Sequence, residues 1–511
     1  MEEVEEKEAK RSQIQKYDGR LGRVANWVDS RLGLSYPMLR PVPQYAINPF
    51  YWLGALAVVA FVIQAITGII MMLYYVPSPT GAYSSTLYIF NNVSFGTFLE
   101  TVHLYTAYAM IMLVFMHLMR GYFVSVQKKP REAMWIVGML MGFVTLGFGF
   151  TGYLLPWTVV SKSATDVGVG MVSALPPPLS SFLTFLIVGS GSDANVLLRF
   201  YDLHVVVLPA ALLILLAVKM YMLESHGVSE PVTEKGIENK KSKKSWLVPV
   251  FPDASFYIFE LAALFGTAML LVSIFFPLTL PPQFTPQLAS QYVSQPDWYF
   301  LWIYQILKIS VFEGQGLPVA LGLVTVIFVA LFLLPFIDGR VEERRISKRS
   351  KYMTIGSIFV AELVVLTFWG LITPGKIIPA EQATLVLGGT ALLVALVSFS
   401  LYRLAYGKVK KVLPTLDIST PIHGSVRKAQ LTTGSVFAIL AGLGALFIGT
   451  SIDAMTRILV LGSNASSLIY LLSSLAALSA TIFATVYVLY RADMHTGAIR
   501  RRVGLLEVGQ K

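Results

Sequence analysis

Three of the six histidines lie inside apolar stretches long enough to cross a membrane, where ionisable side chains are costly and usually functional. His103 and His117 share one stretch and stand 14 residues apart, which returns them to within about 40° of one helix face, roughly 21 Å apart along the axis. His204 lies in another stretch, at a depth that matches His103. Two neutral imidazoles from facing helices can bind a haem iron. The alternative is that they are buried polar residues hydrogen-bonded to one another.

Four glycines in two further stretches repeat the spacing of the histidines. Gly54 and Gly68 are 14 residues apart, and so are Gly138 and Gly152. A macrocycle between helices needs helix faces without side chains at its depth, and glycine provides them; the alternative is ordinary small-residue packing of membrane helices. Because one spacing recurs in three stretches, we expect a four-helix bundle with two haem layers, to whose cofactor-binding surface these glycines belong.

The elements that must position these residues are membrane helices. Of the 511 residues, 55% are hydrophobic and 14% charged, and the mean hydropathy is +0.65. This composition predicts an all-α, polytopic transmembrane helical bundle. The lack of cysteine excludes disulfides and cysteine-bound iron–sulfur clusters in this chain. The ten expected spans are roughly 50–76, 98–122, 133–155, 200–223, 256–277, 317–336, 353–373, 384–405, 433–452 and 466–490.

Charge in the loops predicts the topology. The loop 120–131 and the loops after the fourth and sixth spans are basic, whereas 77–97 has no lysine or arginine. The positive-inside rule places both termini in the cytoplasm and the segments 77–97, 156–199 and 278–316 outside. The net charge of +11 therefore reflects topology and not nucleic-acid binding. The charged N-terminal segment lacks the apolar core of a signal peptide, and 17–34 is expected to form an amphipathic surface helix.

Several short motifs occur in the order found in the cytochrome b family of quinol:cytochrome c and quinol:plastocyanin oxidoreductases. The first span contains QAITG (64–68), the second ends HLMRGY (117–122), the third ends GYLLPW (152–157) and the fourth begins RFYDLH (199–204). The stretch PDWYFL (296–301) resembles the family's PEWY signature, with Asp297 in place of glutamate. The resemblance extends over roughly residues 45–405. PDASFYIF (252–259) and Pro209 are similar to the plastid-type branch, in which the two halves are separate chains.

The resemblance implies that the chain oxidises quinol near the outer surface, between the 156–190 cap and the loop formed by Pro296, Asp297, Trp298 and Tyr299. One electron would pass to a Rieske-type iron–sulfur partner and the other across two haems toward a quinone. Asp297 would accept a proton from quinol, since an embedded carboxylate can have a raised pKa. The alternative role of Asp297, capping the turn before Trp298, is compatible with this one.

The same resemblance assigns the haem-binding residues. His103 and His204 would bind the outer iron and His117 the inner iron. Arg120 would pair with a haem propionate, and the alternative is a simple positive-inside anchor. Arg199 is also assigned to the cofactor-binding surface. The haems are expected to be b-type, with A-type haem as the alternative.

Three features depart from the family pattern. In the plastid-type branch the second histidine of the fourth span follows the first by 15 residues, and this chain has Lys219 there. A neutral lysine amine can bind iron, whereas the alternative is that Lys219 extends toward the cytoplasmic interface. Glu100 stands where many relatives have arginine, and the last two spans have no counterpart in the eight-span family core. The lysine and the extra spans suggest an archaeal branch.

We divide the chain into six segments. The polar stretch 229–245 predicts a flexible linker between a four-span and a six-span part. The segments are a cytoplasmic N-terminal segment (1–49), a haem-binding four-helix bundle (50–225), a basic cytoplasmic linker (226–253), a C-terminal cytochrome b half with the PDWY loop (254–410), a cytoplasmic loop with two extra spans (411–492) and a cytoplasmic tail (493–511).

Two other functional classes stay open from the sequence. One is a haem-bearing membrane anchor of a dehydrogenase, and the other is a haem-free, proton-coupled transporter in which intramembrane histidine and lysine carry protons. The expected location is the cell membrane. The expected partners are a Rieske iron–sulfur protein, other respiratory subunits with a terminal oxidase as an alternative, membrane lipid, and a second copy in a dimer.

Overall fold

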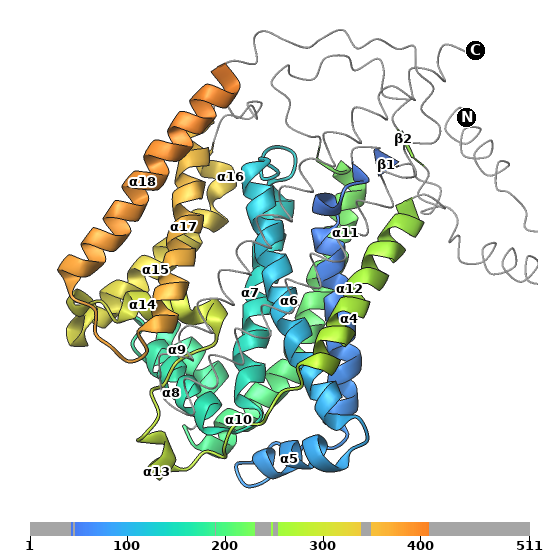
Figure 1. Ribbon diagram of the computed structural model, residues 1–511, viewed down its shortest axis with the longest axis vertical. Helices are drawn as coiled ribbons and strands as arrows, with labels where there is room; N and C mark the ends of the chain where they lie inside the picture. The colour runs from blue at the N-terminus through green and yellow to red at the C-terminus, as the bar shows by residue number, and fades with distance from the viewer. Residues whose placement is uncertain are drawn as a thin grey trace, which may run out of the picture.

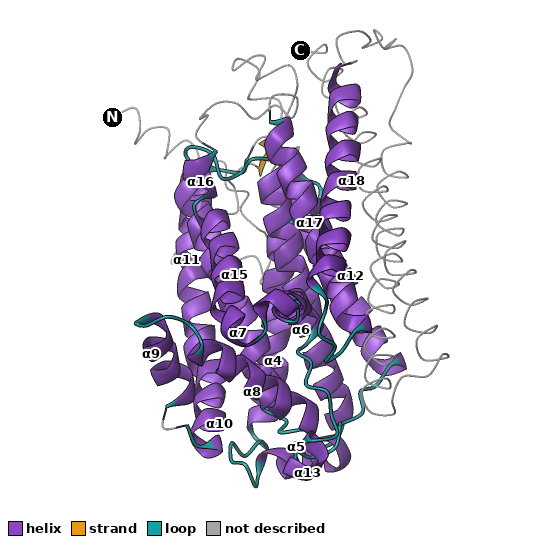
Figure 2. Cartoon of the chain, turned by 90° about the vertical axis from the view of Figure 1, so that its left-hand side faces the viewer, coloured by secondary structure: helices purple, strands orange, loops and turns teal. Residues whose placement is uncertain are grey.

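The computed structural model describes residues 42–43, 46–189, 191–229, 247–248, 254–338 and 349–407. Long helices run side by side through the molecule, and short helices gather at one end (Figures 1 and 2). Within the described residues, seven helices are long and apolar enough to cross a membrane, judged by length and composition. The prediction of an all-α transmembrane bundle is therefore confirmed.

The N-terminal half is a four-helix bundle. Helix α4 packs against α6, α6 against α7, and α7 against α11. In α4 the buried positions Leu53, Leu56, Ala57 and Ala60 recur at helical spacing and line the bundle, whereas Ile66 is 55% exposed on the lipid-facing side. The four spans are α4 (Leu53–Met72), α6 (Gly96–Phe123), α7 (Glu132–Leu154) and the continuous helix Asp193–His226, composed of α10 (Asp193–Asp202), the π-helical turn η4 (Leu203–Val207) and α11 (Leu208–His226).

The C-terminal half lies beside this bundle. Helix α12 packs against α4 and α6, and α17 packs against α14 and α18. Its long helices are α12 (Ser255–Phe275), α15 (Leu317–Phe332), α17 (Ser350–Ile372) and α18 (Ala380–Gly407), and a short helix α16 (Leu334–Ile337) follows α15. Two short strands, β1 (Val42–Pro43) and β2 (Leu247–Val248), pair antiparallel.

The expected number of spans is met in part. Seven of the ten expected spans are long apolar helices, and the sixth is shorter, because α15 has 16 residues. A new helix begins there at Leu334, with Pro335 in its first turn, since proline cannot continue the hydrogen bonding of a preceding helix. The spans expected at 433–452 and 466–490, and the surface helix expected at 17–34, lie outside the described residues.

The short helices belong to the segments expected on the outer side. They are α5 (Ala82–Asn92), α8 (Val159–Ser173), α9 (Leu179–Leu183), the π-helix η3 (Thr184–Val188), α13 (Pro286–Ala289), the 3₁₀ helix η7 (Trp298–Phe300) and α14 (Leu301–Leu307). Three further 3₁₀ turns are η2 (Pro49–Tyr51), η8 (Ser310–Phe312) and η9 (Gly314–Gly316). Thr158 begins α8 with a capping box, in which its side chain and that of Ser161 satisfy each other's backbone N–H groups.

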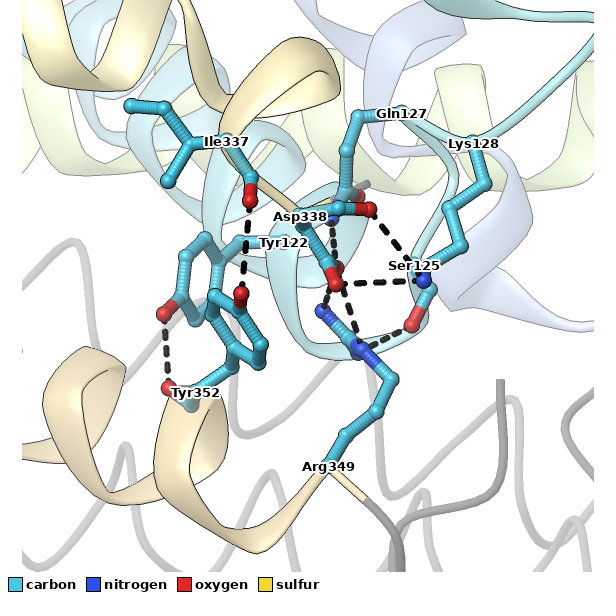
Figure 3. A network of polar contacts seen from close by, with 8 residues as sticks. All are labelled: Tyr122, Ser125, Gln127, Lys128, Ile337, Asp338, Arg349 and Tyr352. Atoms are coloured by element: carbon cyan, nitrogen blue, oxygen red, sulfur yellow. Dashed lines mark hydrogen bonds and ion pairs between the residues drawn. The ribbon is translucent and has the colours of Figure 1, made fainter. Parts of the chain in front are cut away.

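A buried polar network joins the two halves at the opposite end of the bundle (Figure 3). The Asp338 carboxylate lies between Lys128, at 3.1 Å, and Arg349, at 2.7 Å, and all three residues are at most 3% exposed. Arg349 also donates to the Ser125 hydroxyl, and the Gln127 amide donates to Asp338 at 3.3 Å. Removing one partner of a buried ion pair is strongly destabilising. This network therefore fixes the loop after α6 against the start of α17.

Candidate functional site

The two histidines expected to form the outer pair face one another. His103 lies on α6 and His204 in η4, and their ring centroids are 6.4 Å apart. Metal–imidazole bonds are about 2 Å long, so two such bonds plus the radii of two rings come close to this separation. The separation of the rings would allow both imidazoles to bind one metal ion.

Each outer histidine lies against a glycine of another helix. A Cβ atom at Gly68 would stand 3.3 Å from the His103 ring, and one at Gly152 would stand 2.6 Å from the His204 ring. The second distance is shorter than any real side chain tolerates. Gly152 is thus required for the His204 ring to enter the bundle, and a side chain at Gly68 would make a tight contact with the His103 ring.

The inner pair repeats this arrangement with one change. A Cβ atom at Gly54 would stand 3.2 Å from the His117 ring, and one at Gly138 would stand 2.7 Å from Lys219 Nζ. Lys219 is half-buried between two more exposed residues, Val218 and Met220, so its side chain faces the bundle. Its charge is close enough to act on His117. The structure therefore brings all four predicted ligands to the four predicted glycines, one to each.

Two threonines fix the outer imidazoles. Thr67 Oγ1 lies 2.8 Å from His103 Nδ1 and donates its hydrogen to the Ile63 carbonyl at 2.8 Å. Thr151 Oγ1 lies 3.1 Å from His204 Nδ1 and donates to the Gly147 carbonyl at 2.8 Å. If each hydroxyl gives its one hydrogen to the backbone carbonyl, it accepts from Nδ1–H in the histidine–threonine bond. This selects the tautomer that leaves Nε2 free to bind a metal.

The inner site has no such support. His117 Nδ1 is buried and has no hydrogen-bond partner among the described residues. The residues that precede the inner glycines are Leu53 and Val137, whereas threonine precedes both outer glycines. The two sites therefore both have a glycine against each ligand, but they differ in the groups that orient the ligands.

The helix that carries His204 is irregular at that residue. Pro209 has no N–H to donate to the carbonyl four residues earlier, and the chain passes through a π-helical turn at Leu203–Val207. Such turns occur frequently at functional sites. The irregular turn presents His204 to the α6–α7 face.

The two arginines assigned to the cofactor surface contact protein groups. The Arg120 guanidinium lies 3.8 Å from the centroid of the Tyr51 ring. Arg199 donates to the carbonyls of Phe185, at 2.7 Å, and Leu186, at 3.2 Å, and so fixes the η3 segment to α10. Whether either arginine also meets a haem stays a prediction.

The outer loop brings a second group of predicted residues together. Asp297 is 8% exposed and caps the helix η7 by accepting from the Trp298 backbone N–H at 3.1 Å, as the capping interpretation expected. Its other oxygen accepts a hydrogen bond from the Tyr108 hydroxyl at 2.7 Å. Burial raises the pKa of the Asp297 carboxyl to about 6, although both hydrogen bonds oppose the shift. The carboxylate is thus ionised at neutral pH and becomes a proton acceptor of moderate strength.

The residues beside Asp297 are packed closely. The Tyr299 ring fills a space that a Cβ atom at Gly149 of α7 would enter at 2.8 Å from its hydroxyl. The Trp298 ring stands edge-on to Tyr108 at 6.3 Å, and Pro296 directly precedes Asp297 in the loop. These contacts hold the PDWY segment against the four-helix bundle.

The 156–190 cap is joined to the segment that leads into the PDWY loop. The Val159 N–H donates to the Pro282 carbonyl at 2.9 Å, and Thr158 forms an isolated β-bridge with Gln283. The Gln295 amide donates to the Gly370 carbonyl of α17 at 2.9 Å. The cap is therefore fixed to residues 282–283, and the residue before Pro296 is fixed to α17.

Sequence reasoning missed three residues of these sites. Thr67 and Thr151 were visible as a repeated Thr-Gly pair, but the two pairs had no assigned role. Tyr108 lies 189 residues from Asp297, so no local pattern connects them. A tyrosine one and a half turns after His103, on a helix already assigned to the site, was the available signal.

The fold and the two pairs of side chains define a membrane protein with side chains that could bind a metal at two depths of a four-helix bundle. Residues 39–227 match the model of the family Cytochrome b/b6/petB, and residues 286–388 match Cytochrome b(C-terminal)/b6/petD. The chain belongs to the cytochrome b/b6 family.

Similar proteins agree with this assignment. The "Cytochrome bc complex cytochrome b subunit" of Chlorobaculum thiosulfatiphilum is 33% identical, over 69% of this chain and 81% of its own length. The "Cytochrome b" of Sulfolobus acidocaldarius is 28% identical over 80% of this chain and 76% of its own, which is consistent with the expected archaeal branch. The solved structure "Hyperthermophilic respiratory Complex III" has 26% identity and a TM-score of 0.59, and it covers 74% of this chain and 98% of its own.

Membership of this family implies haem binding, and the residues present fit that group. Each candidate ligand lies against a glycine, so the four ligand side chains enter the bundle where no facing side chain takes up the space. Thr67 and Thr151 contact Nδ1 of the outer imidazoles, so Nε2 of each ring is the nitrogen left for a metal, and His117 is a third buried imidazole, whose Nδ1 has no hydrogen-bond partner among the described residues. The site is therefore suited to haem at both depths.

Proposed function

We propose that this chain is the dihaem cytochrome b subunit of a bc-type complex that oxidises quinol on the outer side of the cell membrane. The observation that carries the proposal is the pairing of four ligand-type side chains with four glycines at two depths of one bundle. When bound, the two haems supply one-electron carriers across the membrane. The names of the relatives support the assignment to a bc-type complex.

Different residues bind the haem at each of the two depths. His103 and His204 hold the outer group, in orientations fixed by Thr67 and Thr151. His117 holds the inner group with Lys219 opposite, whose amine already lies against Gly138. Imidazole and a neutral amine are both nitrogen donors, so this set suits iron at each depth.

Quinol oxidation is assigned to the outer loop. Quinol can lose electrons only if it also loses protons, and we assign the acceptor role to the buried Asp297 carboxylate, whose pKa of about 6 leaves it ionised at neutral pH. Of the two electrons of quinol, one passes to a Rieske-type iron–sulfur partner and the other toward the two haem sites. Both termini lie in the cytoplasm, and the complex contains further respiratory subunits and a second copy of this chain.

Haem counting tests the proposal directly. The purified wild-type protein should yield two haems per chain in a pyridine haemochrome assay, and His103→Ala should yield one. His226→Ala is the matched control, because His226 is exposed and its ring contacts its own helix at the Met222 carbonyl. A wild-type protein without haem would favour the transporter alternative, and two haems in His103→Ala would contradict the ligand assignment.

A second measurement separates quinol oxidation from the dehydrogenase-anchor alternative. Asp297→Asn removes the proton acceptor but no haem ligand, so quinol oxidation should slow by about tenfold or more while haem content is unchanged. In the wild type the rate should fall as the pH drops through about 6, because protonation removes the acceptor. An unchanged rate in Asp297→Asn at every pH would refute this role.

A further inference from the structure

The Asp297 carboxylate is held by a residue of the haem-binding bundle. Tyr108, on α6, is 4% exposed and donates to Asp297 Oδ2 at 2.7 Å. The other oxygen accepts from the Trp298 backbone N–H. Both oxygens of the carboxylate are thus engaged within the protein, one by the loop itself and one by the helix that carries His103.

Asp297 has a short side chain, and Tyr108 spans the distance from α6 to it. The signature that this loop resembles has glutamate where this chain has Asp297, and aspartate is one methylene shorter. Tyr108 is long enough to cross from α6 to the loop, and its ring packs beside Trp298 and Tyr299, with centroids 6.3 and 6.4 Å away. The longer Tyr108 side chain therefore provides most of the length between α6 and the Asp297 carboxylate.

We propose that Tyr108 is a positioning residue of the quinol site, which keeps Asp297 ionised and oriented so that it can receive the proton of quinol. This inference rests on the proposed function. Transfer of the proton from the quinol hydroxyl to Asp297 converts the carboxylate to a carboxylic acid. That change weakens the bond from Tyr108, because a phenol donates more strongly to an anion than to a neutral acid.

Three phenols surround the carboxyl group. They are Tyr108 from α6, Tyr153 from α7 and Tyr299 from η7. Among them, the structure gives Tyr108 the hydrogen bond to Asp297, and that bond lowers the pKa which burial raises. Removal of the Tyr108 hydroxyl should therefore leave the carboxyl with a higher pKa.

The test compares two tyrosines of one helix. Tyr108→Phe should move the acidic limb of the quinol-oxidation profile upward by about one pH unit, since a hydrogen bond to an ion is lost. Tyr105→Phe is the control: Tyr105 is equally buried but donates to the Phe276 carbonyl at 2.8 Å, so the limb should stay in place. Haem content, read from the visible spectrum, should be unchanged in both.

Infrared titration measures the effect of Tyr108 on the pKa of Asp297 without quinol. The C=O band of protonated Asp297, identified by its loss in Asp297→Asn, should titrate about one pH unit higher in Tyr108→Phe than in wild type. Coincident titrations would overturn the role of Tyr108. If the wild type oxidises no quinol, the proposed function fails, and the infrared result still decides the pair.

If Tyr108→Phe does not assemble, a measurement that does not need this variant tests the same role. In the wild type a tyrosine ring band should shift at the same pH as the Asp297 carboxyl band, and Asp297→Asn should abolish that shift. A wild-type protein in which no tyrosine band follows the carboxyl titration would contradict the proposal.

Discussion

The outer and inner sites of the bundle are built from the same glycine spacing and completed in different ways. At the outer site two imidazoles face each other, and a threonine hydroxyl holds each Nδ1. At the inner site one imidazole faces the amine of Lys219, and His117 Nδ1 has no partner among the described residues. The glycines create the space in both cases, but only the outer pair is fully oriented by the protein.

The comparison shows that making space for a cofactor and orienting its ligands are separate requirements. Removing side chains at one depth of a helix pair requires only glycine at the correct spacing. Orienting an imidazole requires an acceptor for its second nitrogen, and such groups tune affinity and redox potential. The outer site should therefore be rigid and the inner site tolerant of substitution.

Loss of a histidine should have the largest effect. His204→Ala should reduce the haem content from two to one per chain, because His103 alone cannot replace the second imidazole of a rigid pair. Lys219→Ala should keep two haems, since His117 and both inner glycines remain. The measurement is haem per chain after purification. Equal losses in the two variants would mean that the sites are equally dependent on both ligands.

Filling a glycine face should have the next largest effect. Gly152→Ala places a methyl group 2.6 Å from the rigid His204 ring, which cannot move without leaving Thr151. We expect a cost of about 1–3 kcal/mol and a severalfold loss of outer haem. Gly138→Ala meets the flexible end of Lys219 at 2.7 Å, so the inner haem should be retained. Thermal unfolding and haem counting of both variants test whether Gly152→Ala is the more damaging substitution.

Opening the inner site should change ligand binding without changing haem content. If the Lys219 amine completes the inner site, the wild type should not bind carbon monoxide, whereas Lys219→Ala should bind it at one haem. Lys219→His should close the site again, because imidazole also suits iron. Carbon monoxide difference spectra measure this. Binding by the wild type at the inner haem would instead support the alternative that Lys219 extends toward the cytoplasm.

The sequence was sufficient for whatever depends on helical repetition. A spacing of 14 residues is fixed by helix geometry, so the two depths and the recurrence of glycine at both could be predicted, whereas the contact of each glycine with a ligand-type side chain could not. The extent of a helix was harder: the fourth span begins at Asp193, seven residues before its apolar part, because Ser192 caps an amphipathic first segment. Its apolar composition alone could not show this.

Contacts between distant residues could not be predicted. The bond from Tyr108 to Asp297 depends on how the C-terminal half docks on α6, and the network around Asp338 depends on the same docking. The threonine at each outer glycine was visible, but its role depends on the direction in which its hydroxyl points. That direction follows from the backbone carbonyls four residues earlier, which only the folded helix brings into range.

The smallest expected effect tests the threonines themselves. Thr67→Val and Thr151→Val preserve side-chain shape and remove the acceptor for the histidine Nδ1–H. An imidazole that donates a hydrogen bond is a stronger electron donor to its metal, and this favours the oxidised state. Loss of the bond should therefore raise the potential of the outer haem by some tens of millivolts and leave the inner haem unchanged. Redox titration with optical detection resolves such shifts.

Thr145→Val is the matched control for this measurement. Thr145 lies on the same helix as Thr151, is equally buried, and donates to the Met141 carbonyl at 2.9 Å without a histidine partner. It should shift neither potential, because it changes the interior of α7 but not a ligand. If Thr145→Val moved the outer potential as far as Thr151→Val, the effect would belong to helix packing. A shift confined to Thr67 and Thr151 would show that the outer site differs from the inner one in how its ligands are oriented.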